Sequence, residues 1–224
     1  MSTVLPLLHL CDSLFPIGGF SHSDGLESAT ASGRVGSVAD LRSWMRAYLN
    51  ETLCRCDGPS VRIAWEGFGP AAWEAVWRAD EELNALRPSA AARAASRAMG
   101  TRLLKTAHRL RPHPALAGLM EQMGESGVTL PVAFGVVCAA AGIGLRETLE
   151  GFLYTRLVAV VSSAMRLMAL GQHDAHALLV EMLAESPSVV DDVLDRRDGP
   201  AQFAPALDLA AMCQQYVHSR LFTS

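Results

Sequence analysis

The sequence predicts an all-α protein, because both its composition and its hydrophobic spacing favour helices. Ala contributes 34 and Leu 30 of the 224 residues, whereas Ile and Tyr contribute 3 each; strands prefer branched and aromatic side chains. Half of the residues are hydrophobic and 19% are charged, which is typical of a chain with a substantial core. Since no repeat or linker divides it, we expect residues 1–224 to form one compact domain of about eight to ten helices around a buried central helix.

Three helices are predicted in the first half of the chain. Hydrophobic residues at helical spacing cover 41–52, and Ser37 stands where a helix cap is needed. A second pattern covers 73–83. Ser89 caps a third helix over 92–110, which two closely spaced prolines then end.

The longest predicted helix lies in the second half, over 145–168. Its stretch 157–165 carries no charge, so we expect this part to be buried on all sides. A shorter helix over 175–183 precedes a proline. The charged, turn-rich stretch 191–200 indicates a surface loop, and 203–216 a last helix.

Charge and cysteine content exclude several classes of protein. The net charge of −4 gives no general attraction to nucleic acid. Five cysteines at irregular spacing indicate neither a disulfide framework nor a zinc ribbon, and they favour the reducing cytoplasm. Residues 126–145 are uncharged, but Gly and Pro interrupt them. We therefore expect a buried core helix over 132–141 and no contact with a membrane.

The most unusual segment is 12–27, which reads DSLFPIGGFSHSDGLE. Pro16 and Gly18 disfavour regular structure there. Ser21 with Asp24 three residues later resembles a capping box, so a helix is expected to begin at this point. The segment is either a fixed loop that orients this first helix or a rigid site for a partner or ligand.

An enzymatic interpretation of the same segment is weaker. Asp12, His22 and Glu27, with Ser21 or Ser23, supply acid–base chemistry in principle. However, no second cluster elsewhere completes a pocket, and no phosphate-binding loop, nucleophile elbow or HExxH motif occurs. We therefore predict no catalytic residue.

Metal binding has little support. His173 and His176 share one helix face, but two histidines without a third ligand form only a weak site. We predict no metal ligand and no cofactor.

An ordered set of motifs resembles the urease accessory protein UreF family over nearly the whole chain. The segment 12–27 is similar to the signature of that family: an Asp-Ser pair, Pro-x-Gly-x-Phe, Ser/His-Ser and Gly-Leu-Glu. Further similar motifs follow in the family's order: Met99-Gly100 with Leu103-Leu104, Pro131 to Gly135, Tyr154, Arg166-Leu167, Leu170-Gly171-Gln172, and Ser219 to Ser224.

Three positions depart from the family pattern. Thr129 stands where many members have His, so a role tied to that His does not transfer. Thr223 replaces a common Arg, which is expected to weaken contacts made by the end of the chain. His218 lies in a stretch that is often more basic in relatives.

The resemblance implies a function without catalysis. UreF proteins are all-helical, tend to form homodimers, and bridge UreD (also called UreH) and the GTPase UreG. That complex delivers nickel to apo-urease, and modulation of GTP hydrolysis by UreG is an open question for the family. The alternatives are a helical small-molecule sensor or, with less support, an enzyme using the 12–27 segment.

Two segments are the expected partner-binding regions, because Arg and aromatic residues dominate interfaces. Pro16 to Glu27 is expected to contribute to the dimer interface or to the surface that faces UreG, and the second segment is the end of the chain. We expect 217–224 to be flexible until a partner binds, with Leu221 and Phe222 entering an apolar pocket of UreD and Arg220 fixing the register. The partner-binding residues are Phe20, His22, Glu27, Arg220, Leu221 and Phe222. The expected structural residues of the motifs are Pro16, Gly18, Ser21, Ser23, Gly25, Leu26, Gly135 and Gln172.

Overall fold

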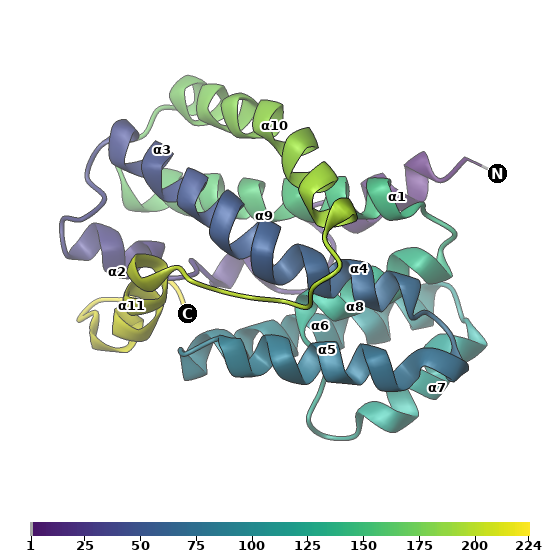
Figure 1. Cartoon of the computed structure of the whole chain (residues 1–224). Helices are drawn as coiled ribbons and strands as arrows, with labels where there is room; N and C mark the ends of the chain where they lie inside the picture. The colour runs from purple at the N-terminus through teal and green to yellow at the C-terminus, as the bar shows by residue number, and fades with distance from the viewer. Residues whose placement is uncertain (1) are drawn as a thin grey trace.

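The computed structural model describes residues 2–224, and within this range the regular structure is helical without strands (Figure 1). Because α3, η2 and α4 follow one another without a break, they form one continuous helix. Counted in this way, the described residues form ten separate α-helices. The all-α prediction is confirmed. The elements are α1 (Val4–Cys11), η1 (Gly19–Ser21), α2 (Leu26–Ala31), α3 (Val38–Ala47), η2 (Tyr48–Asp57), α4 (Gly58–Glu66), η3 (Pro70–Ala72), α5 (Trp73–Leu86), α6 (Ala90–Leu110), α7 (Pro114–Met123), α8 (Leu130–Ala140), α9 (Leu145–Leu167), α10 (Gln172–Asp195), α11 (Pro205–Cys213) and η4 (Gln214–Tyr216).

The buried central helix is α8, which packs against α4, α6 and α9. All of its residues from 130 to 138 are buried. Glycines permit the close packing: a Cβ on Gly135 would lie 2.5 Å from the carbonyl oxygen of Val61, and one on Gly100 would lie 2.3 Å from that of Val128. A side chain at either position would push α8 away from its neighbours.

The long helix α9 is less buried than the sequence predicted. Its apolar stretch 157–165 was expected to be covered on all sides, but Ser162 is exposed and Val158 is half-buried. Small residues on that side leave α9 at the surface, whereas α8 occupies the centre.

The continuous helix of α3, η2 and α4 begins as predicted and then changes from α-helical to π-helical turns. Ser37 and Asp40 form a reciprocal capping box at the start of α3, which satisfies amide groups that a helix start leaves free. The segment η2, from Tyr48 to Asp57, is a π-helix. Such wide turns are rare, and nothing in the hydrophobic spacing of 41–52 indicated one.

The cap residue Ser89 also predicted the start of α6 correctly, whereas the expectation that a proline ends a helix gave a wrong end for α10. Ser89 accepts a hydrogen bond from the backbone of Ala92, as expected of a cap. Pro187, however, lies inside α10. Its neighbours Met182, Val189 and Val190 are buried, so packing keeps the helix continuous despite the lost hydrogen bond. The predicted loop over 191–200 is consequently helical as far as Asp195.

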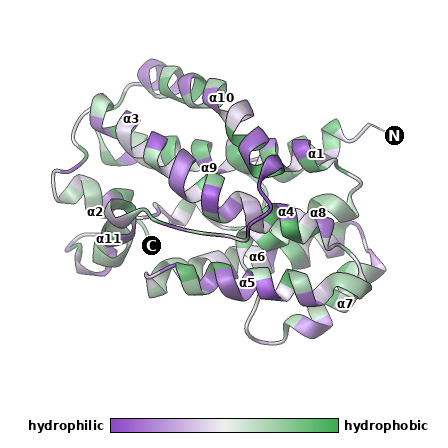
Figure 2. Cartoon of the chain, viewed as in Figure 1, coloured by the Kyte–Doolittle hydropathy of each residue, from purple (hydrophilic) through white to green (hydrophobic). Residues whose placement is uncertain are grey.

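Hydrophobic and hydrophilic residues alternate along the surface helices (Figure 2). Across residues 2–224 no helix combines the length and the apolar character that crossing a bilayer requires. The short helix α1, which the sequence patterns did not indicate, packs on α9 yet has no fully buried residue.

Candidate functional site

The end of the chain lies on the unusual loop near its start. We call residues 12–27 the loop motif and residues 217–224 the tail. The backbone amide of Thr223 donates to the carbonyl of Ser21 at 2.8 Å, and that of Ser23 donates to the carbonyl of Ser224 at 2.6 Å. His22 Nδ1 lies 2.7 Å from Ser224 Oγ. The two regions, about 200 residues apart in sequence, therefore form one composite surface.

Glu27 anchors the tail through hydrogen bonds to its carboxylate. Its carboxylate accepts hydrogen bonds from the backbone amides of Leu221 and Phe222 and from the side chain of Gln214. Gln214 also accepts from the amide of Ser28 at 3.2 Å. Glu27 is only 3% exposed, so in this conformation its carboxylate is an internal anchor and does not reach a partner.

Phe222 is likewise an internal contact, with only 3% of its surface exposed. The guanidinium of Arg166 on α9 lies 4.2 Å above its ring, a cation–π contact. Arg166 also donates to the carbonyl of Phe20 at 2.9 Å. The tail in the structure is thus docked on its own chain, which differs from the expected flexible tail whose Phe222 enters a partner.

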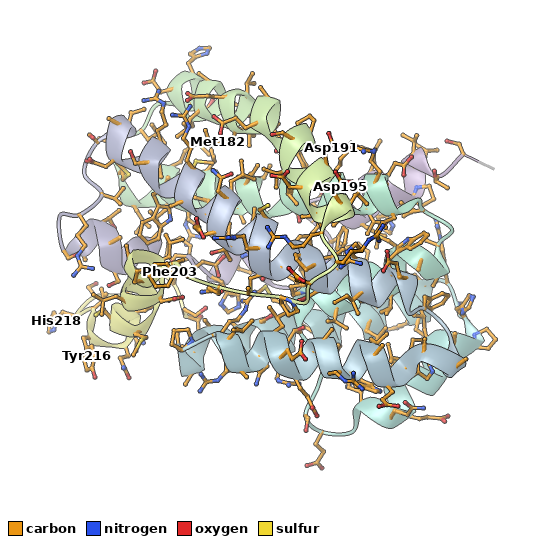
Figure 3. All side chains as sticks on the ribbon, in the orientation of Figure 1. Met182, Asp191, Asp195, Phe203, Tyr216 and His218 are labelled. Carbon is orange, nitrogen blue, oxygen red and sulfur yellow. The ribbon has the colours of Figure 1, made fainter. Side chains whose placement is uncertain are left out.

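Several side chains of this composite surface remain open to solvent. Phe20 is 77% and Leu221 60% exposed, and Arg220, which directly precedes Leu221, is exposed as well. Tyr216 and His218 project outward beside α11 (Figure 3). Grouped exposed apolar residues of this kind indicate an interaction surface.

The backbone of the loop motif requires its glycines. Gly18 has φ 80° and packs against Arg102, and Gly25 has φ 85° with room for no Cβ beside the backbone of Ala211. Both conformations are unfavourable for other residues. Ser21 Oγ donates to the carbonyl of Gly18 at 2.8 Å, so Ser21 closes the loop.

The predicted capping box of Ser21 and Asp24 is wrong. Helix α2 begins later, with Gly25 at its cap position and no side-chain cap. Asp24 instead forms an ion pair with the buried Arg156 of α9, in which the Asp24 carboxylate is itself half-buried, and Tyr48 donates to the same carboxylate at 3.3 Å.

The linked side chains of Asp24, Arg156 and Tyr48 fix the loop motif to the core. Arg156 Nε also donates to the hydroxyl of Tyr48 at 3.1 Å. Burial acts to raise the pKa of Asp24, but the charges of Arg156, Arg87 and His22 and the hydrogen bond from Tyr48 together outweigh burial and hold that pKa below its ordinary value. Asp24 has a left-handed backbone, with φ 51°, which this pairing stabilises.

His22 is neutral more readily than an exposed histidine. Burial lowers its pKa, Asp24 opposes that effect, and the positive charges of Arg156 and Arg102 add to it. A neutral imidazole suits the contact with Ser224, since it can either donate or accept.

The remaining structural residues lie in two places. Ser23 and Leu26 are buried in the site, whereas Pro16 is exposed on the loop. Gly135 belongs to the core packing of α8, and Gln172 is exposed at the start of α10. The structure therefore does not bring these last two to the site.

The position of Thr129 has a structural explanation. Its amide and its hydroxyl both donate to the buried carboxylate of Asp80, at 2.8 and 2.7 Å. Arg97 pairs with the same carboxylate at 3.3 Å. Thr129 thus anchors the start of α8. Thr223, the other departure, contributes a backbone bond and an exposed side chain.

The residues considered for chemistry each have a structural partner. Asp12 accepts from the amide of Leu14, while His22 and Glu27 contact the tail. Over the part of the chain that the structure describes, no group of three His, Cys, Asp or Glu side chains is placed to hold a metal ion. His173 and His176 are exposed on α10.

The structure is thus an all-helical domain whose loop motif and tail together present exposed apolar and basic side chains. Comparison with known proteins gives the family. The UreF family model matches residues 35–183. Proteins named "Urease accessory protein UreF" are similar over almost their full length. The one from Actinobacillus pleuropneumoniae serotype 5b (strain L20) is 30% identical over 97% of both chains. Those from Lachnoclostridium phytofermentans and Haemophilus influenzae (strain Rd) are 29% and 30% identical, covering 99% and 97% of this chain and 98% and 94% of theirs.

The chain belongs to the UreF family of urease accessory proteins.

Sequence reasoning missed the residues that build the site from a distance. Gln214 and Arg156 carried no local signal, since each acts on a residue more than 100 positions away. Arg166 was noticed only as part of a motif resemblance. Apart from its place directly before the uncharged stretch 157–165, nothing in the sequence indicated Arg156.

Proposed function

We propose that this protein bridges UreD (UreH) and the GTPase UreG in the complex that inserts nickel into apo-urease, and that it does so as a homodimer without catalysing a reaction. The observation that carries the proposal is the composite surface on which the docked tail and the loop motif present Phe20, Arg220 and Leu221 together. Aromatic, Arg and apolar side chains on a rigid support are suited to binding proteins.

The six partner-binding residues then divide into two roles. Phe20, Arg220 and Leu221 contact the partner directly, since they face solvent. The remaining three position the tail from within the chain: His22, Glu27 and Phe222.

The test is co-purification of tagged protein from cells that express UreD and UreG together or singly. A complex of all three proteins is expected, and deletion of 220–224 should abolish recovery of one partner. The point variant Leu221→Ala should weaken partner binding about tenfold, as for an interface residue worth ~1.4 kcal/mol. Val180→Ala is the matched control, because Val180 is similarly exposed on α10.

Two results would contradict the proposal. One is the absence of any complex from folded, monodisperse protein. The other is an equal effect of Leu221→Ala and Val180→Ala on partner recovery, which would remove the tail from the interface.

A further inference from the structure

The stretch around α6 is strongly basic in an otherwise acidic chain. Residues 83–120 hold seven of the 19 Lys and Arg side chains and none of the 23 Asp and Glu, although the whole chain has a net charge of −4. The seven are Arg87, Arg93, Arg97, Arg102, Lys105, Arg109 and Arg111.

The cations toward the start of this stretch are used inside the molecule. Arg87 pairs with the buried Asp57 at 2.6 Å, and Arg97 pairs with Asp80. Arg93 donates to two backbone carbonyls that precede α6. These charges serve to hold the fold together.

The last three cations have no such role. Lys105, Arg109 and Arg111 are exposed, and none forms an ion pair or a side-chain hydrogen bond with residues 2–224. The dipole of α6 favours a cation at Arg109, in its last turn. The dipole likewise favours Arg111, the C-cap residue of α6, but it does not account for Lys105, which lies before the last turn.

An apolar cavity of about 260 Å³ opens at the end of this stretch, between α1, α6, α7 and α8, and Arg111 lies in its lining. Its lining includes Phe15, Leu116 and Val137, and the polar groups in the lining are basic. No Asp or Glu contributes to it; the basic lining residues are His9, Arg111 and His113.

Apolar surface continues outside the cavity. Leu110 lines it and is 56% exposed, and Leu14, next to the lining residue Phe15, is 87% exposed. A small ligand inside the cavity would leave these leucines in water. An occupant that covers them must be larger, with apolar groups at its centre and negative charge at its edges.

We propose that this face docks an acidic amphipathic segment of a protein partner. Its apolar side chains enter the cavity and cover Leu14 and Leu110, while its carboxylates meet Arg111 at the cavity and Arg109 next to Leu110. Charge complementarity selects such a segment over a basic or neutral one. No residue of the tail lines the cavity. Leu14 and Phe15 belong to the loop motif, so this face adjoins the composite surface, but it does not include Phe20, Arg220 or Leu221, on which the bridging proposal rests.

The probe is a fluorescein-labelled synthetic helical peptide of Leu and Glu with all leucines on one face. A second peptide has Lys in place of Glu. Fluorescence anisotropy at about 0.1 M salt, where exposed charges are partly screened, gives the affinity of the full-length protein for each. Saturable binding of the acidic peptide alone is expected.

Three variants separate charge from shape. Arg109→Glu/Arg111→Glu should weaken binding at least tenfold. Ala107→Leu, which narrows the cavity without changing charge, should weaken it by a similar factor; Ala140→Leu replaces it if Ala107→Leu does not fold. Arg34→Glu/Arg197→Glu makes the same charge change at exposed, unpaired positions elsewhere in residues 2–224 and should alter affinity by less than about twofold.

Three outcomes would overturn the proposal. One is no binding of the acidic peptide up to about 1 mM. Another is equal weakening by the two double variants, which would indicate general charge attraction. The third is binding to phosphatidylserine vesicles that depends on Arg109 and Arg111 without binding of the peptide, which would make the face a membrane site. Deleting 220–224 should leave peptide affinity unchanged, so failure here is distinguishable from failure of the bridging proposal.

Discussion

The core around α8 and the composite surface of loop motif and tail are held together by different means. Around α8, apolar side chains and close helix contacts at Gly100 and Gly135 exclude water. At the surface, the tail depends on backbone hydrogen bonds, the carboxylate of Glu27 and the ring of Phe222. Apolar packing of this kind is disturbed by a change in side-chain volume, whereas polar anchoring fails when one partner of a hydrogen bond or ion pair is lost.

The largest expected effect comes from the ion pair that joins the two regions. Arg156→Met leaves the half-buried carboxylate of Asp24 without its counter-charge. The free energy of unfolding, measured by urea titration, should fall by about 3 kcal/mol, the lower end of the range for buried ion pairs, because Asp24 keeps some contact with solvent. Adding Asp24→Asn should restore part of this loss, because the buried charge is then removed. A loss below about 1 kcal/mol for Arg156→Met would show that the pair does not anchor the loop motif.

A test of the core alone is Gly135→Val. The new side chain meets the backbone of Val61, so unfolding free energy should fall by about 2–3 kcal/mol. Gly118→Ala on α7 is the matched control, since a Cβ there meets nothing within 4 Å. It should stabilise the protein by up to about 1 kcal/mol through helix propensity. Equal destabilisation by both would refute the close packing of α8.

The tail should respond to Glu27→Ala while the core does not. Losing the acceptor of two backbone amides should favour the released tail by about 1.5–3 kcal/mol. Cleavage by trypsin after Arg220 should accelerate at least tenfold with little change in the urea midpoint. Glu125→Ala, at an exposed position, should cleave like the parent protein. A large shift in the urea midpoint would mean that tail and core unfold together.

The smallest expected effect is on pH dependence. The pKa of His22 is lowered from 6.5 when the tail is docked, so the released state takes up a proton more readily. Docking therefore strengthens as pH rises toward neutrality and weakens as pH falls through the ordinary range of histidine. An NMR titration should show the His22 pKa below 6.5 in the parent protein and nearer 6.5 in Glu27→Ala. The same pKa in both proteins would separate His22 from tail docking.

Local signals in the sequence predicted much of the fold. The caps at Ser37 and Ser89 were placed correctly, because a cap depends on residues within one helical turn. The cap rule was wrong at Asp24, because its carboxylate pairs with the distant Arg156. The rule that proline ends a helix was wrong at Pro187, because packing there outweighs a lost hydrogen bond. Local rules hold where no tertiary partner competes.

The site was predictable only in part. The loop motif stood out through Gly18 and Gly25, and both glycines have the left-handed backbone that the motif requires. That Glu27 receives the amides of Leu221 and Phe222 could not be inferred, since no periodicity connects positions about 195 residues apart. The contacts that a side chain makes across the fold are therefore not visible in its local sequence.

The central claim is that the loop motif and the tail form one surface before any partner binds. Hydrogen exchange of backbone amides in the full chain, without UreD or UreG, tests it most directly. The amides of Ser23, Leu221 and Thr223 should exchange at least tenfold more slowly than in an unstructured peptide, and Glu27→Ala should remove most of the protection at Leu221. Exchange of these amides at the unstructured rate in the parent protein would contradict the account.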